Sequence, residues 1–487
     1  MDSPNQKPLA KIGQRIALAG LILYVVSAPH SVAASAIAIG IAGTGWLLRT
    51  ASTHNLGLRR TKFDLIILLS VLWTVASALL SIEPAISIAK IKASWCVFIF
   101  YLTRAVLTKR SVLLLAVMLI ASASVGALYS TYDLLRGRGV VLQSLSMDSP
   151  FRRLEIRPGD TIWRVGGKRV YSESDIDEAI KSLPADIPVS ISLISNGEHV
   201  ELPGFSVSDA VKNDVRPSGV AGTGRSHRFR ASGWTRHYET FAEILQMIGQ
   251  LALGLALAHL RNHGINRYFK IALPAVFLIA LGIALTAMRT SLLAFGGAAF
   301  FIAWRSTRGV AKLVVTFTLF FVLAFGAVVI WQTRAPDALL LGDDSSSLRS
   351  QVARVGFSRI LIHPIFGHGM DSMHKHWTEW GFPGRDMLHL HSTPLQLAFD
   401  RGLPMLALWL WMMILFWIHL VRAQGRAAET SDTNTYGLLL GASGALTGFL
   451  LSSIVNYNYG DSEVVMLFWW LMGAALVMSM AMKAPSN

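Results

Sequence analysis

The chain has 487 residues, of which 53% are hydrophobic and only 15% are charged. A soluble domain usually carries about 25% charged residues, so this composition excludes an ordinary soluble fold and indicates a polytopic membrane protein. The net charge of +15 does not indicate nucleic-acid binding, because Lys and Arg gather at the ends of apolar segments, where they fit anionic lipid headgroups. Cys96 is the only cysteine, so an internal disulfide is excluded, and it lies inside an apolar segment.

Long apolar segments organise the whole chain. A helix needs about 20 mostly apolar residues to cross a bilayer. Twelve apolar segments can be read along the chain, and we predict that each forms a transmembrane helix. These segments are residues 13–28, 31–48, 63–81, 87–106, 111–132, 239–259, 268–287, 291–305, 312–332, 395–420, 435–456 and 463–482.

The short connections between these segments are rich in basic residues. If twelve helices are counted, all the basic clusters fall on one side of the membrane, and the positive-inside rule makes that side cytoplasmic, with both termini inside. The two long connections, 133–238 and 333–394, are then expected on the opposite side. The clusters are Lys7, Lys11 and Arg15; Arg49, Arg59, Arg60 and Lys62; Arg104, Lys109 and Arg110; Arg261, Arg267 and Lys270; Arg305, Arg308 and Lys312; and Arg422 and Arg426.

The first long connection has the pattern of a small α+β domain. Strands are predicted at 139–142, 189–193 and 199–202, with Asn196-Gly197 as the turn between the last two. A helix is predicted over 174–183, and its N-cap is expected to be Ser174, the first residue of that segment.

The residues from about 137 to 206 follow the pattern LxIRPGDxIxxVxGxxV, which resembles a PDZ domain. PDZ domains commonly accept a peptide as an added strand. The residues before Gly139 depart from the usual peptide-binding loop, so a peptide reader and a degenerate spacer stay open as alternatives. A polar linker rich in Arg, Ser and Gly is expected over 207–238.

Two groups of cations adjoin apolar segments on the side of the long connections. Arg289 stands between two apolar runs with almost no loop, and an Arg at membrane depth usually has a partner or a function. Residues 228–237 add further cations, including Arg230 and Arg236, just before the sixth predicted helix. Anion capture is one interpretation, because the guanidinium fork matches phosphate oxygens. Snorkelling of Arg289 to the interface, or pairing with anionic lipid, is the structural alternative.

The second long connection ends at His391, where the polar residues give way to an apolar segment. Neutral imidazole is a good general base near pH 7. His389, together with His374 and His376, raises the question of a metal site. No Cys or HExxH motif accompanies these histidines, so no metal site is predicted. A purely structural histidine remains the alternative for His391.

Three motifs in this order resemble the O-antigen ligase and polymerase superfamily of bacterial envelopes. Arg349 is followed by His363-Pro364 and a Gly-rich continuation, as in the family pattern "hPxxGxG". His391-Ser392 is followed after nine residues by Gly402, although Met405 stands where the ligases have a second glycine. The sequences TAMRTSLLAF at 286–295 and RASGWTRHYETFAEIL at 230–245 resemble the starts of two family helices.

The resemblance implies a GT-C type fold and a metal-independent, inverting glycosyl transfer without a cofactor. The donor would be a glycan on undecaprenyl pyrophosphate, and the ligase acceptor would be lipid A–core. Arg289 and Arg230 would bind the donor pyrophosphate, with Arg236 close enough to substitute for Arg230. Arg349 and His389 would contribute to substrate binding, and His391 would activate the acceptor hydroxyl.

Other functions stay open at this stage. A polysaccharide polymerase and a protein O-oligosaccharyltransferase belong to the same superfamily, and the PDZ-like domain could supply the latter with a peptide partner. A transporter and a periplasmic PDZ scaffold are the alternatives outside enzymes, although no repeat of broken helices supports a transporter. The expected location is the bacterial inner membrane, with the active site periplasmic.

These expectations divide the chain into six regions. Residues 1–132 would hold five helices, 133–206 the periplasmic PDZ-like domain, 207–238 a linker, 239–332 four helices, 333–394 the periplasmic catalytic loop, and 395–487 the last three helices.

Overall fold

The computed structural model describes residues 8–482, apart from residues 155, 196–197, 236, 308, 311, 315, 318–319, 322–323, 326–327, 329–343, 385 and 431. Within this part, ten helices are long and apolar enough to cross a membrane. They are α1 (Pro8–Ser27), α2 (Val32–Thr53), α3 (Lys62–Leu80), the segment Pro84–Val106, α6 (Lys109–Arg136), α9 (Tyr238–His263), α10 (Arg267–Leu285), α15 (Thr393–Glu429), α16 (Thr433–Ser453) and α17 (Ser462–Met480).

Ten of the twelve predicted membrane segments are therefore confirmed as long apolar helices. The segment predicted at 291–305 forms a helix, α11 (Arg289–Ser306), but arginines near both ends make it less apolar than the others. The segment predicted at 312–332 lies largely outside the described residues. The fourth helix is irregular, because α4 (Pro84–Lys90) and α5 (Val97–Val106) are joined by the 3-10 helix η1 (Ile91–Cys96).

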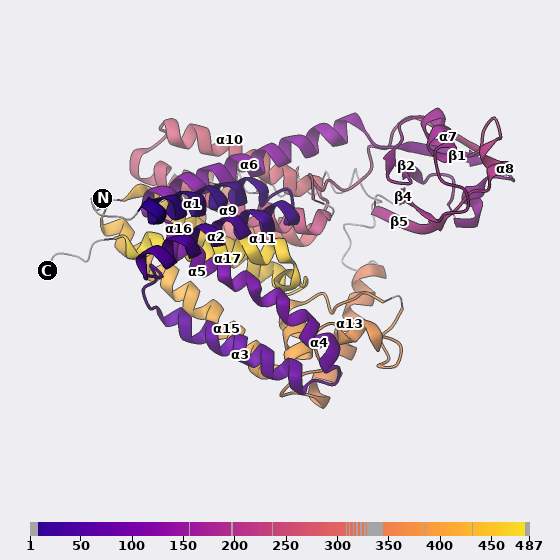
Figure 1. The fold of residues 1–487 in the computed structure, drawn as a ribbon. Helices are drawn as coiled ribbons and strands as arrows, with labels where there is room; N and C mark the ends of the chain where they lie inside the picture. The colour runs from indigo at the N-terminus through magenta and orange to yellow at the C-terminus, as the bar shows by residue number, and fades with distance from the viewer. Residues whose placement is uncertain are drawn as a thin grey trace.

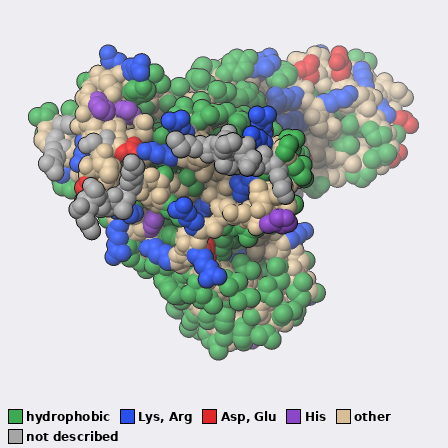
Figure 2. Space-filling view, turned by 60° about the vertical axis from the view of Figure 1, so that its left-hand side comes forward, with side chains coloured by type: hydrophobic (Ala, Val, Ile, Leu, Met, Phe, Trp, Pro, Cys, Tyr) green, Lys and Arg blue, Asp and Glu red, His purple; other side chains and the backbone are tan. Residues whose placement is uncertain are grey.

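The start of α1 and the end of α17 lie at one end of the helical bundle (Figure 1). The small domain and the helices α4 and α13 (Asp344–Ile362) lie at the other end (Figure 1). The two long connections thus share one end of the bundle, away from the termini. Figure 2 shows Lys and Arg side chains spread over the upper and middle part of one face and a broad apolar surface below them, as expected for a protein surrounded by lipid.

Helices α9, α16 and α17 form the buried centre of the bundle. Small residues allow α9 and α16 to approach closely, since a Cβ on Gly254 would meet the backbone nitrogen of Gly441 at 2.3 Å. Gly437, Gly444 and Gly448 continue this contact along α16. The packing fixes the position of the first two turns of α9, where Glu239 and Glu243 lie.

The small domain contains a six-stranded antiparallel sheet in the order β5-β4-β2-β1-β6, with β3 paired to β2 (Figure 1). Helix α7 packs its apolar residues against this sheet. The strands are β1 (Val140–Leu145), β2 (Thr161–Val165), β3 (Lys168–Arg169), β4 (Val189–Ser195), β5 (Glu198–Phe205) and β6 (Val220–Thr223), and the helices are α7 (Glu173–Lys181) and α8 (Asp209–Lys212).

Two details of the small domain differ from the sequence prediction. The N-cap of α7 is Ser172, whose hydroxyl accepts from the Asp175 amide at 3.2 Å, so the helix begins before the predicted Ser174. Strand β6 lies within residues 207–238, which were expected to be a linker. Its four residues contain one glycine and no clear alternation, so the sequence offers little sign of a strand. The predicted turn at 196–197 lies outside the described residues.

Candidate active site

A cavity of about 900 Å³ lies at the end of the bundle shared by the two long connections. Its walls come from α3, the irregular fourth helix, the first turn of α9, the loop before α15, the first turns of α15, and the segment between α16 and α17. Of the predicted site residues, His389 and His391 line it. The cavity therefore brings together residues from most of the chain around the predicted base.

The shape of α15 determines one wall of this cavity. The helix is interrupted at Gly402, whose φ is 80°. A Cβ at this position would meet the carbonyl oxygen of Ile365 at 1.8 Å, so only glycine fits. Leu403 donates its amide to Pro364 at 2.7 Å, instead of to the preceding turn of its own helix. The break directs Arg401 to the cavity wall.

The loop before α14 (Ser372–Lys375) satisfies the backbone groups that this break exposes. The carbonyl of Phe399 accepts from the His368 amide at 2.7 Å, and that of Asp400 accepts from the Gly369 amide at 3.0 Å. Pro404 has no amide that could bond to Asp400. The two stretches that resembled family motifs, 363–369 and 391–402, are therefore one packed unit.

Helix α3 holds this unit from the other side. The hydroxyl of Ser77 donates to the Phe366 carbonyl at 2.7 Å, and the indole of Trp73 donates to the Arg401 carbonyl at 2.9 Å. The ring of Trp73 stacks on Phe366 with centroids 5.5 Å apart. These contacts fix the depth of Arg401 relative to the bundle.

His391 occupies a strained turn immediately before α15. Its φ is 49°, and its ring lies 4.5 Å from that of His389, centroid to centroid. The amide of Leu390, between them, donates to the Gln396 side chain at 2.7 Å. The amide of Thr393 donates to the Asn456 carbonyl at 3.0 Å. The turn is thus fixed both by α15 and by the segment that follows α16.

Burial, the neighbouring His389 and the charge of Arg349 lower the pKa of His391 to about 3. Burial is also the main cause that lowers the pKa of His389. Both rings are therefore neutral at physiological pH, and each has a nitrogen that can accept a proton.

Arg349 lies on α13 and reaches the first turn of α9. Its guanidinium lies 3.8 Å from the carboxylate of Glu239, which lines the cavity. The structure thus places Arg349 beside the histidine pair, as its effect on the pKa of His391 also indicates.

Arg230 and Arg289 belong to segments that meet at the same end of the bundle. The amide of Ala231 donates to the carbonyl of Leu285 at 3.0 Å, a few residues before Arg289 begins α11. The guanidinium of Arg230 lies 4.0 Å from the centre of the Tyr238 ring, and the residue is 7% exposed. Neither arginine lines the cavity of His391. Arg236 lies outside the described residues.

Several polar residues of the cavity were not among the predicted site residues. Glu243 is buried on α9 and accepts from Ser452 at 2.8 Å and from Asn456 at 2.9 Å. Arg401 and Asp400 come from the break in α15. The sequence contained two signals for this set, namely acidic residues in the first turns of an apolar helix and the polar run 456–461 between two spans. The remaining charged residues are Lys90, Lys92, Glu239, Asp371 and Asp461.

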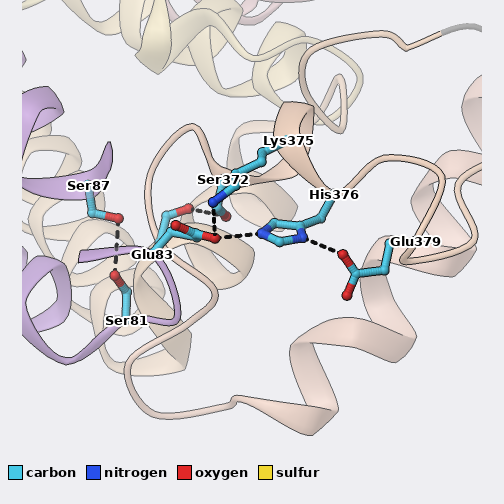
Figure 3. A network of polar contacts seen from close by, with 8 residues as sticks. Ser81, Glu83, Ser87, Ser372, Lys375, His376 and Glu379 are labelled. Atoms are coloured by element: carbon cyan, nitrogen blue, oxygen red, sulfur yellow. Dashed lines mark hydrogen bonds and ion pairs between the residues drawn. The ribbon is translucent and has the colours of Figure 1, made fainter. Parts of the chain in front are cut away.

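A network of polar contacts joins α14 and the residues just after it to Glu83, at the start of the fourth helix (Figure 3). Glu83 accepts from Lys375 at 2.7 Å and pairs with His376 at 2.7 Å, and the other nitrogen of His376 pairs with Glu379 at 2.6 Å. Lys90 forms a further ion pair of 2.8 Å with Asp371. Both ring nitrogens of His376 therefore contact carboxylates.

Among the residues that the structure describes, no group of three His, Cys, Asp or Glu side chains could hold a metal ion. The side chains whose charge acts on the histidine pair include Arg349 and Glu239.

Residues 274–410 match the protein-family model described as O-Antigen ligase. No curated protein matches the chain significantly. The match supports the superfamily that the motifs predicted, and its range includes Arg289, Arg349, His389 and His391. It does not reach the small domain, and the predicted PDZ identity of that domain is not supported.

Proposed function

We propose that this protein is an inverting, metal-independent glycosyltransferase that moves a glycan from undecaprenyl pyrophosphate to lipid A–core. The observation that carries the proposal is the position of His391. It lies, with Arg349 beside it, on the wall of a cavity lined by several charged residues, and both belong to the region that matches the O-antigen ligase model. In this proposal the cavity faces the periplasm, and the basic end of the bundle with both termini faces the cytoplasm of an inner-membrane protein.

The arginines are assigned to the pyrophosphate of the donor. Pyrophosphate is a good leaving group once its charge is neutralised, and fixed guanidinium groups supply that charge with bidentate geometry. Arg230 and Arg289 come from segments that meet at one end of the bundle, and Arg349 lies near the histidines. The lipid tail would remain in the bilayer while the glycan enters the cavity.

His391 is assigned as the general base. A hydroxyl of the acceptor attacks the anomeric carbon as the bond from that carbon to the pyrophosphate oxygen breaks, with inversion. The hydroxyl proton passes to a nitrogen of His391, which is neutral because burial lowers its pKa to about 3. The negative charge of a bound donor would raise this pKa and make the imidazole a more effective base.

His389 and Glu239 would complete the site. His389 lies against His391 and is assigned to substrate binding. Glu239 lines the cavity and contacts Arg349, so it would hold that guanidinium in place before the donor binds.

Reconstitution with a lipid-linked glycan and three alternative acceptors tests the function. Transfer to lipid A–core supports the ligase, whereas transfer to a second lipid-linked glycan identifies a polymerase and transfer to a peptide identifies a protein O-oligosaccharyltransferase. The wild-type protein should be compared with His391→Ala at equal amounts in the membrane. Absence of transfer to every acceptor by an intact wild-type protein would contradict the proposal and leave a transporter or a scaffold.

A further inference from the structure

In the small domain an extended segment lies between strand β1 and helix α7. The space between β1 and α7 is called the groove. In the structure the groove is filled by β6, which pairs antiparallel with β1 at the end of the sheet. The pairing continues beyond the strand, since Ser146 donates to the Gly219 carbonyl at 2.8 Å, and Arg138 and Ser226 exchange two hydrogen bonds.

Helix α7 holds the outer edge of the same segment. The carboxylate of Glu173 accepts from the amide of Gly222 at 2.5 Å, and that of Asp177 accepts from the amide of Ser218 at 3.0 Å. These two amides do not point toward β1. In an ordinary edge strand, amides on the outer side would form hydrogen bonds with water. Here both edges of β6 are bound.

Side chains anchor the segment in the groove as well. Val220 is 4% exposed and belongs to the apolar core of the domain. Ser218 is 1% exposed, and its carbonyl accepts from the hydroxyl of Ser149 at 2.6 Å. A Cβ on Gly222 would meet Val140 at 2.5 Å and the Val141 carbonyl at 2.9 Å, so the fit at this position admits only glycine.

The chain runs from this groove directly to the predicted donor site. Phe229 is buried beneath the guanidinium of Arg138, which lies 4.5 Å from its ring centre. Two residues later, Ala231 bonds to the end of α10. Arg230 lies between these two anchors, so its backbone is held from the small domain on one side and from the bundle on the other.

We propose that residues 218–226 are a built-in ligand of the small domain, and that their docking between β1 and α7 positions Arg230 for the donor pyrophosphate. The groove is then closed to peptides from other proteins, and the domain serves as a fixed support for one arginine. The assignment of Arg230 to the donor rests on the proposed function, whereas the docking itself does not.

A pair of valine variants tests the docking. Gly222→Val places a side chain against Val140, whereas Ala221→Val places the same side chain at an exposed neighbouring position. In the full-length protein, hydrogen–deuterium exchange of residues 224–237 should accelerate at least about tenfold in Gly222→Val and stay unchanged in Ala221→Val. Equal exchange in the two variants would overturn the docking, whether or not the protein transfers a glycan.

A reversible lock gives a second test that does not depend on a disruptive variant. Val141 and Thr223 are cross-strand partners, a geometry in which a disulfide can form. The Val141→Cys/Thr223→Cys protein should form this disulfide and transfer glycan at the wild-type rate before and after reduction. Loss of transfer that reduction restores would overturn the proposal, because it would show that β6 must leave the groove.

Steady-state kinetics separate positioning from general damage. If docking acts through Arg230, Gly222→Val should raise the KM for the lipid-linked donor severalfold with little change in kcat. Combining it with Arg230→Ala should raise KM no further than Arg230→Ala alone, because both changes remove one interaction. Additive effects would overturn the link to Arg230. If the wild-type protein transfers no glycan, the proposed function fails while the exchange measurements still decide the docking.

Discussion

The guanidinium of Arg349 lies 3.8 Å from the carboxylate of Glu239 and joins α13 to the first turn of α9. The contact therefore joins two helices whose charged side chains lie near the candidate base His391 and its neighbour His389. Arg349 also contributes to the low pKa of His391, because a nearby positive charge disfavours protonation of the ring.

Replacing Arg349 by Gln should therefore raise the pKa of His391 and weaken donor binding. The acidic limb of the pH profile of kcat/KM should shift to higher pH, since less positive charge opposes protonation of the base. Arg354→Gln is the matched control, because Arg354 is an exposed arginine on the same helix. An unchanged profile in Arg349→Gln would separate Arg349 from the histidines.

The two histidines should respond differently to substitution. His391→Ala should reduce kcat by at least about 100-fold, the usual range for loss of a general base. His389→Ala should mainly raise the KM for substrate, because its ring lines the same cavity without a catalytic assignment. Kinetic constants for the two purified variants provide the comparison. A wild-type kcat in His391→Ala would assign the base elsewhere.

Gly402→Ala should destabilise the protein by on the order of 3 kcal/mol, because the position combines a φ of 80° with a steric conflict against Ile365. Gly425→Ala on the same helix is the control, since its Cβ would meet nothing within 4 Å. That change should be neutral or stabilising by up to about 1 kcal/mol, as glycine is a poor helix former. Thermal unfolding in one detergent measures both, and equal midpoints would refute the structural role of Gly402.

The network around Glu83 and His376 should make the loop sensitive to pH. Hydrogen bonds to Glu379 and Glu83 raise the pKa of His376 above its ordinary value of 6.5. The protonated ring therefore stabilises the contact fully below pH 6.5. This stabilisation is lost as the pH rises through the raised pKa. Hydrogen bonds from Lys375 and His376 lower the pKa of Glu83 below its ordinary value of 4.5. The ionised carboxylate therefore stabilises the contact fully above pH 4.5, and this stabilisation is lost only as the pH falls through the lowered pKa.

The contact should therefore be strongest between about pH 4.5 and 6.5. Hydrogen exchange of residues 371–380, corrected for the intrinsic effect of pH, should accelerate as pH rises above this window. In His376→Gln the dependence should disappear. If this variant retained the full dependence, another group would have to be responsible.

The sequence predicted the helices well because transmembrane segments are specified locally, by length and hydropathy. His389 and His391 were predicted from their place at the end of a polar connection, and both line the same cavity. Strand β6 was missed because its partners, β1 and α7, lie far away in the chain. Glu243 and Arg401 were missed for a similar reason. Each looks like an isolated polar residue near an apolar segment, and only packing shows that both line one cavity.

The break in α15 has a consequence for how substrates arrive. The amides of His368 and Gly369 replace bonds that an unbroken helix would make within itself, and the Leu403 amide bonds to Pro364 in return. Lifting this loop would break three backbone hydrogen bonds and leave six backbone groups without these partners. Each such group that stays away from water costs roughly 1–3 kcal/mol. The loop is consequently an unsuitable lid. In the proposed reaction the substrates therefore reach the cavity by another route, and opening of the 363–369 segment should not limit turnover.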